Sequence, residues 1–137
     1  HIRGTPNTMQ MDTVYSDLLL DIKEFLLKSI AIAKKSNIAD HKIIIDPGIG
    51  FGKSLEQNYS IIHNISFFKK MGYPVLIGLS RKSLIGKLYY TEEDRLPATI
   101  ALNSIAVYNG ADIIRVHDVK EHKLMIEPLK ILQKVSR

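Results

Sequence analysis

The stretch HKIIIDPGIGFGKS, residues 41–54, decides the fold of this 137-residue chain. Residues 41–46 form a continuous run rich in isoleucine, and such a run is typical of a strand buried on both faces of a parallel sheet. A proline and three glycines then end the strand. Ser54 and Gln57 form a capping-box pattern, which predicts a helix that runs to about Lys70.

Helices and strands are expected to alternate on both sides of this stretch. Upstream, apolar residues at spacings of three and four predict an amphipathic helix over 13–35. Downstream, the apolar runs 74–79 and 111–117 predict two more buried strands. The segment 94–109 between them predicts a helix, and Gly110 is expected to end it.

The tail from Lys120 onward completes the pattern. Its apolar residues have helical spacing, and Pro128 within them is expected to kink or split the helix. Strict alternation of helices with apolar strands predicts an α/β protein with a parallel sheet. Both an open doubly wound sheet and part of a (β/α)₈ barrel fit this order.

Composition excludes several classes of protein. Apolar residues make up 45% of the chain and charged residues 24%, which is typical of a globular domain and not of a disordered chain. No apolar run approaches the roughly 20 residues that cross a bilayer, so no membrane partner is expected. The absence of cysteine excludes a disulfide scaffold, a thiolate zinc site and a cysteine nucleophile, and it fits a cytoplasmic protein.

The balance of charge bears on the ligand. A formal net charge of +5 favours an anionic ligand. Nucleic-acid binding needs a basic stripe with interleaved aromatic residues or a recognisable module. Basic residues occur instead in scattered pairs, at 34–35 and 69–70. We therefore expect a small anionic ligand and no nucleic acid.

Polar or glycine-rich chemistry follows each of the three predicted strands. Asp46 leads into the glycine loop, Gly78 leads into the segment 80–83, and Arg115 and His117 lie at the end of the third strand. In parallel α/β architectures, sites are built at the edge where the carboxyl ends of the strands meet. The three strand ends are therefore expected to form one site.

Asp46 and the glycine loop each have two interpretations. Asp46 could cap the following turn with its side chain, or it could accept two parallel N–H donors from a ligand. The loop 47–54 could cradle a phosphate, although Pro47 departs from the Walker A pattern and Lys53 departs from the dinucleotide pattern. The alternative is a flexible turn that needs glycine. Phe51 is expected to stack on a ligand or form a pocket wall.

The cations at the other two strand ends suit an anionic or heterocyclic ligand. Lys82 has a compact positive charge and could donate a hydrogen bond to a ring nitrogen or a carbonyl oxygen of a ligand. Arg115 and His117 are two residues apart on a strand, so they share a face and could clamp a diphosphate. An ion pair of these residues with Asp112 or Asp118 is the alternative.

Four blocks of this chain, at residues 1–6, 46–53, 78–83 and 115–119, resemble the C-terminal half of the dihydropteroate synthase family. The resemblance implies a (β/α)₈ barrel of the pterin-binding type. It implies an Mg²⁺-assisted transferase of folate biosynthesis, which joins 6-hydroxymethyl-7,8-dihydropterin diphosphate to 4-aminobenzoate with release of diphosphate. The implied reaction is a substitution at the pterin methylene without a covalent enzyme intermediate, and the full-length protein is expected to be a cytoplasmic homodimer.

The resemblance also implies roles for individual residues. Asp46 and Lys82 are the implied catalytic residues, and the metal ligands are expected upstream of this chain. The implied binding residues are Asp46, Gly78 and Lys82 for the pterin, Phe51 and Ser83 for the aminobenzoate, and Arg115 and His117 for the diphosphate.

The length of the chain limits what it is expected to do alone. A (β/α)₈ barrel takes about 250 residues, so residues 1–137 are expected to be one partial pterin-binding domain that lacks its N-terminal half. His1 is not expected to be the first translated residue, because the chain has no initiator methionine. Since half a barrel has open strand edges, we expect the isolated chain to be inactive and to aggregate or pair with another half.

Three other functions are weighed against this one. A methyltetrahydrofolate-dependent corrinoid methyltransferase has a related barrel, but the blocks at 80–83 and 115–118 argue against it. A phosphate-binding NTPase domain is disfavoured by Pro47. The third alternative is a non-catalytic half barrel that serves only to pair with a complementary chain.

Overall fold

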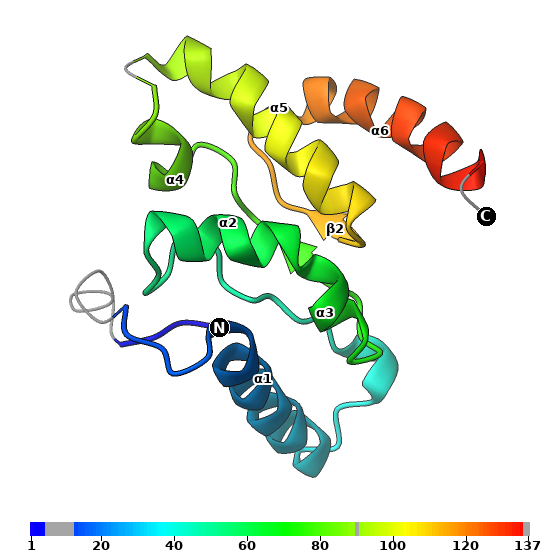
Figure 1. The fold of residues 1–137 in the computed structure, drawn as a ribbon. Helices are drawn as coiled ribbons and strands as arrows, with labels where there is room; N and C mark the ends of the chain where they lie inside the picture. The colour runs from blue at the N-terminus through cyan, green and yellow to red at the C-terminus, as the bar shows by residue number, and fades with distance from the viewer. Residues whose placement is uncertain (5–12, 90, 136–137) are drawn as a thin grey trace.

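The computed structural model describes residues 1–4, 13–89 and 91–135. Most of the described chain is helical, and short extended segments alternate with the helices. The elements, in chain order, are α1 (Leu18–Lys35), the 3₁₀ helix η1 (Asp40–Lys42), α2 (Leu55–His63), α3 (Ile65–Lys69), β1 (Leu76–Ile77), α4 (Ser83–Gly86), α5 (Glu92–Tyr108), β2 (Ile113–Ile114) and α6 (Val119–Val135) (Figure 1).

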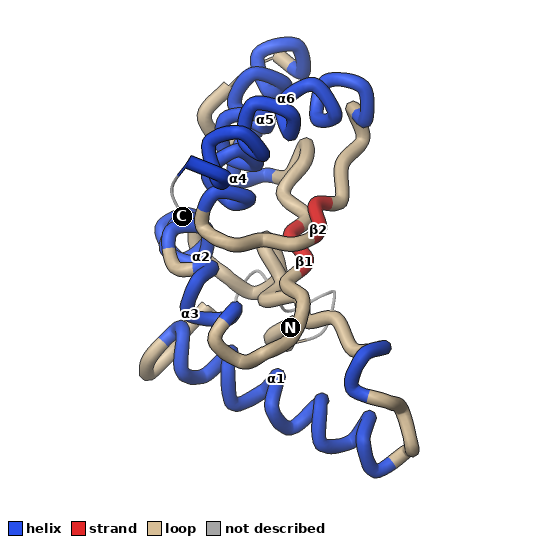
Figure 2. The backbone as a smooth tube through the Cα atoms, turned by 90° about the vertical axis from the view of Figure 1, so that its right-hand side faces the viewer, coloured by secondary structure: helices blue, strands red, loops and turns tan. Residues whose placement is uncertain are grey.

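A small parallel sheet lies in the middle of the molecule. β1 pairs with β2 in parallel, with Leu76 opposite Ile113 and Ile77 opposite Ile114. On the other side of this pair, a single parallel bridge joins Ile45 to Val75. Figure 2 shows β1 and β2 side by side, with α1 at one end of the molecule and α5 and α6 at the other. This order of helices and parallel strands fits part of a (β/α)₈ barrel, one of the two architectures expected from the sequence.

The hydrophobic core lies between the extended segments and the helices. Ile45 is 3% exposed, whereas its neighbour Ile44 is 51% exposed, because successive side chains of an extended segment point to opposite faces. In this segment, the face that packs against the helices is therefore the buried one. The core consists mainly of Ile22, Leu26 and Ile30 of α1, Ile61, Ile62, Ile65 and Phe68 of α2 and α3, and Ile45, Val75 and Ile77 of the extended segments.

The strand predicted at 41–46 is largely wrong. Residues 40–42 form η1, in which the N–H of Lys42 donates to the carbonyl oxygen of Ala39 and that of Ile43 to Asp40. Of the predicted strand only Ile45 is bridged, and the exposure of Ile44 contradicts burial on both faces. The other two predicted strands form, but β1 and β2 are shorter than 74–79 and 111–117.

The predicted helices form with different ends. α1 begins at Leu18 and not at Thr13, because the Asp17 side chain accepts hydrogen bonds from two backbone N–H groups of the first turn. The capping box of Ser54 and Gln57 is confirmed. The helix that follows is divided at Asn64, whose backbone leaves the helical region at φ −104° and ψ 28°.

Later in the chain, Gly110 ends α5 with a φ of +110°, as expected. α6 runs unbroken through Pro128, so of the two expected outcomes the split does not occur and the kink stays a prediction. The short helix α4 after β1 was not expected from the sequence. Within the described ranges, no helix is both long and apolar enough to cross a membrane.

Candidate active site

A cavity of about 230 Å³ lies at the carboxyl ends of β1 and β2. The parallel pairing of these strands brings segments 37 residues apart into contact. Two of the residues predicted to bind the pterin and the two predicted to bind the diphosphate therefore line the same cavity. It is lined by Gly78, Ser80, Lys82, Arg115, Val116 and His117.

Gly78 leaves room for the Arg115 guanidinium. A Cβ atom at Gly78 would lie 3.3 Å from Nε of Arg115 and 3.5 Å from its Nη2. The ion pairs weighed for Arg115 do not form, because Asp118 binds Arg81 at 2.7 Å and Asp112 binds Lys69 at 2.5 Å. The guanidinium thus lies across β1 and lines the cavity.

Lys82 lies over the glycine loop. Its Nζ donates to the carbonyl oxygen of Ile49 at 2.5 Å and lies 4.4 Å from the centroid of the Phe51 ring. Burial lowers the pKa of Lys82, Asp46 opposes that shift, and the charge of Arg115 adds to it. An ammonium has three N–H donors, so Lys82 keeps donors for a ligand while Phe51 forms the wall beside it.

The N–H groups of two glycines in the loop donate to side chains of the protein itself. The N–H of Gly48 donates to Oδ1 of Asp46 at 2.7 Å, and that of Gly50 donates to Oδ1 of Asn58 at 2.6 Å. A phosphate cradle would need such groups free to face the ligand. The bonds of Gly48 and Gly50 therefore favour the alternative interpretation, a turn that needs glycine, and a phosphate cradle stays an untested prediction.

The carbonyl groups of the same loop face two ammonium groups instead. Nζ of Lys53 donates to the carbonyl oxygens of Gly48 and Phe51 at 2.8 and 2.9 Å. Ile49 receives the bond from Lys82 described above. The loop binds cations from within the chain, and the positive φ angles that this shape needs at positions 48, 50 and 52 are allowed by glycine.

Asp46 caps the turn, which is the simpler of its two interpretations. Its Oδ1 accepts the Gly48 N–H at 2.7 Å, and this bond also fixes the direction of the carboxylate. The N-terminal amino group of His1 donates to the backbone oxygen of Asp46 at 2.6 Å, so the start of the chain lies beside this strand end. Contact of Asp46 with a pterin stays a prediction.

Lys53 is a buried cation that sequence analysis overlooked. It is 4% exposed, and its Nζ lies 3.0 Å from Nδ1 of His1. Burial is the main cause that lowers its pKa to about 7, with Lys82 adding to the shift and Asp46 opposing it. Its position directly after the glycine loop is the feature of the sequence that could have indicated it. From the sequence alone, Lys53 is considered only as a departure from the dinucleotide pattern.

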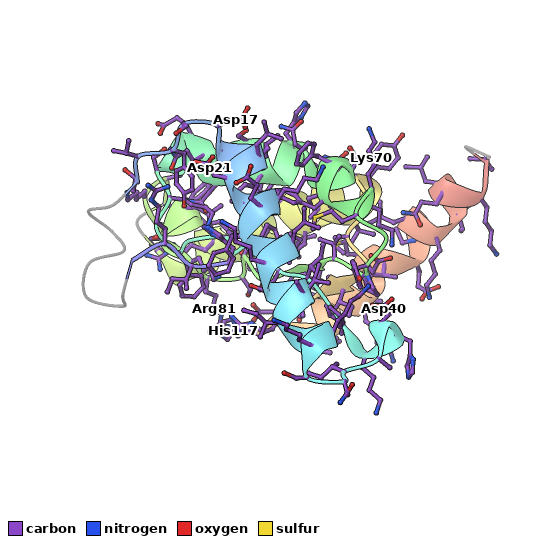
Figure 3. All side chains as sticks on the ribbon, turned by 90° about the horizontal axis from the view of Figure 1, so that it is seen from below. Asp17, Asp21, Asp40, Lys70, Arg81 and His117 are labelled. Atoms are coloured by element: carbon purple, nitrogen blue, oxygen red, sulfur yellow. The ribbon has the colours of Figure 1, made fainter. Side chains whose placement is uncertain are left out.

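Two side-chain links join the loops that follow β1 and β2. Oγ of Ser80 lies 3.0 Å from Nδ1 of His117, and Nη2 of Arg81 donates to Oδ1 of Asp118 at 2.7 Å. Arg81 has a φ of +57°, which costs energy for a residue with a side chain. Figure 3 shows Arg81 and His117 from below, on one side of the molecule.

The predicted aminobenzoate residues lie apart from this cavity. Phe51 reaches it only through Lys82, and Ser83 is an exposed residue at the start of α4. Neither Phe51 nor Ser83 is among the described residues that line the cavity. Nor do the described residues contain a group of three or more carboxylates or histidines that could hold a metal ion.

Comparison with known proteins decides the family. The model of the family described as pterin binding enzyme matches residues 1–117. The chain belongs to this family. A dihydropteroate synthase of Escherichia coli K12 is 39% identical over 134 residues, which cover 97% of this chain and 46% of that protein. The chain therefore spans about half the length of the curated relative that it matches.

Solved structures of pterin-binding enzymes have the same fold. The Yersinia pestis dihydropteroate synthase in a sulfonamide drug complex matches with a TM-score of 0.95 and 37% identity, over 98% of this chain and 50% of that one. The Thermus thermophilus dihydropteroate synthase, in complex with 6HMPPP, matches with a TM-score of 0.90 and 32% identity, over 97% and 53%.

Proposed function

We propose that this chain forms the pterin- and diphosphate-binding half of a dihydropteroate synthase. The reaction joins 6-hydroxymethyl-7,8-dihydropterin diphosphate to 4-aminobenzoate and releases diphosphate. The observation that carries the proposal is the cavity at the ends of β1 and β2, because Lys82, Arg115 and His117 line it together. An arginine, a lysine and a histidine donor in one cavity suit an anion such as diphosphate.

The proposed mechanism is a substitution at the pterin methylene. Arg115 and His117 bind the diphosphate and stabilise the charge that develops on it as the bond to the methylene breaks. Lys82 donates to the pterin ring from above the glycine loop, and Asp46 accepts N–H donors at the edge of the ring. The amine of 4-aminobenzoate then attacks the methylene, beside Phe51 and Ser83.

The rest of the proposed enzyme lies outside these residues. A bound Mg²⁺ would neutralise charge on the diphosphate, and its ligands would come from the other half of the barrel. The described residues offer no such ligand set, so the chemistry proposed for this chain is that of its own side chains. A homodimer of the complete protein is part of the same proposal.

A chimera tests this function directly. The 134-residue segment of the Escherichia coli relative that matches this chain would be replaced by the chain itself. We expect the purified chimera to form dihydropteroate and diphosphate, and Arg115→Met in the chimera to reduce turnover by roughly tenfold or more. A folded chimera without diphosphate release would overturn the proposal, and methyl transfer from methyltetrahydrofolate would favour the corrinoid-dependent alternative.

A further inference from the structure

Ser80 lies almost wholly inside the protein, unlike the two cavity residues predicted to bind diphosphate. It is 5% exposed, whereas Arg115 and His117 are exposed at the cavity. Its Oγ lies 3.0 Å from Nδ1 of His117 and accepts the backbone N–H of His117 at 3.4 Å. The buried hydroxyl thus contacts His117 twice.

These two contacts determine where the ring proton lies. The backbone N–H can only donate, so Oγ accepts there. The hydroxyl hydrogen then needs an acceptor, because a buried donor without a partner costs free energy. Among the described residues its acceptor is Nδ1 of His117. A neutral imidazole that accepts at Nδ1 carries its proton at Nε2.

We propose that Ser80 is a positioning residue that holds neutral His117 as the Nε2–H tautomer, so that the ring donates a hydrogen bond to an anion without carrying a positive charge. The inference rests on the proposed function, which makes diphosphate the anion. The charged groups around the ring are Lys82 and Arg115 in the cavity and Arg81 and Asp118 in the adjoining loops. Since the lysine and the arginine also only donate, the cavity then offers an anion three side chains that donate hydrogen bonds.

The first test measures the tautomer itself. In the ¹⁵N-labelled chain, the shifts of the two ring nitrogens of His117 would be recorded at about pH 8, where an ordinary imidazole is neutral. We expect the proton at Nε2 in the wild type and in Ser80→Thr, and a mixture of both tautomers in Ser80→Ala. Ser104→Ala is the matched control, because that hydroxyl donates to the carbonyl oxygen of Ile100 in its own helix.

The second test measures the consequence for binding, with inorganic pyrophosphate as the probe. We expect Ser80→Ala to bind it about tenfold more weakly than the wild type at about pH 8. Ser80→Thr should restore binding, because threonine keeps the hydroxyl group that donates to Nδ1 of His117.

The two tests separate this inference from the proposed function. A proton at Nδ1 in the wild type, or a tautomer ratio that Ser80→Ala leaves unchanged, would overturn the inference. So would an affinity for pyrophosphate that Ser80→Ala leaves unchanged. Failure of the wild type to bind pyrophosphate would count against the diphosphate site of the proposed function, and the tautomer would still decide the role of Ser80.

Discussion

At the scale of single residues, the site depends on close approaches that only certain side chains allow. Gly78 shows this, because its missing Cβ provides the space in which the Arg115 guanidinium lies. The sequence marks both residues as candidates, since each follows an apolar run. Their contact depends on the register of β1 against β2, which a single sequence does not reveal.

Gly78→Val is therefore expected to weaken pyrophosphate binding by roughly tenfold, because the guanidinium loses its place in the cavity. Calorimetric titration would measure the change. The control is the same substitution in an Arg115→Met background, where we expect little further loss. An equal loss in both backgrounds would show that the valine acts on something other than Arg115.

Lys53 carries a pH dependence whose sign follows from burial. Its pKa falls from an ordinary 10.5 to about 7 in the folded protein, so between these values the unfolded chain binds a proton that the folded chain does not. The free energy of unfolding should therefore rise with pH in this range, by up to about 1.4 kcal/mol per pH unit. Below about pH 7 this contribution is constant and unfavourable.

Urea unfolding between about pH 7 and 9 would test this, with Lys53→Met beside the wild type. The wild type should gain stability with pH relative to Lys53→Met, because methionine has no proton to lose. Lys35→Met removes an exposed lysine at the end of α1 and should retain the wild-type slope. Parallel slopes for the wild type and Lys53→Met would contradict a pKa near 7.

At the scale of helices and strands, local chemistry decides where each element ends. The alternation of helices with parallel extended segments is confirmed, and so are the capping box at Ser54 and the stop at Gly110. The sequence does not predict the start of α1, because the apolar pattern extends to Val14 beyond the cap at Asp17. Nor does apolarity alone tell that residues 40–42 form a 3₁₀ helix.

The cap of α1 can be tested by substitution. Asp17→Ala should lower the free energy of unfolding by about 1 kcal/mol, because two N–H groups of the first turn lose their acceptor. Asp17→Asn should keep most of that stability, since an amide oxygen also caps a helix. The urea midpoints of the three proteins would measure this, and a loss as large in Asp17→Asn would point to the charge and not the cap.

At the scale of the whole molecule, two open sides separate this chain from a closed barrel. Ile44 lies half-exposed on the side of the extended segments that the helices leave uncovered. At the other end of the small sheet, a groove of about 880 Å³ runs between β2 and α6, lined in part by Val107, Ile113 and Leu129. A sheet with open edges pairs readily with further strands.

The structural features that could be predicted from the sequence are those that depend on local signals. Periodicity and the strand-end residues are local signals, so fold class and most of the cavity could be predicted from the sequence. The cation-binding carbonyls of the glycine loop and the buried position of Lys53 depend on packing between distant segments. The spacing of residues in the sequence does not predict such contacts.

One measurement tests the central claim most directly. This chain would be mixed with the part of the Escherichia coli relative that lies outside the matched segment, and dihydropteroate formation would be followed. We predict no product from either part alone and product from the mixture, with Arg115→Met in this chain abolishing most of it. Dihydropteroate from this chain alone, or none from a mixture shown to form a folded complex, would contradict the account.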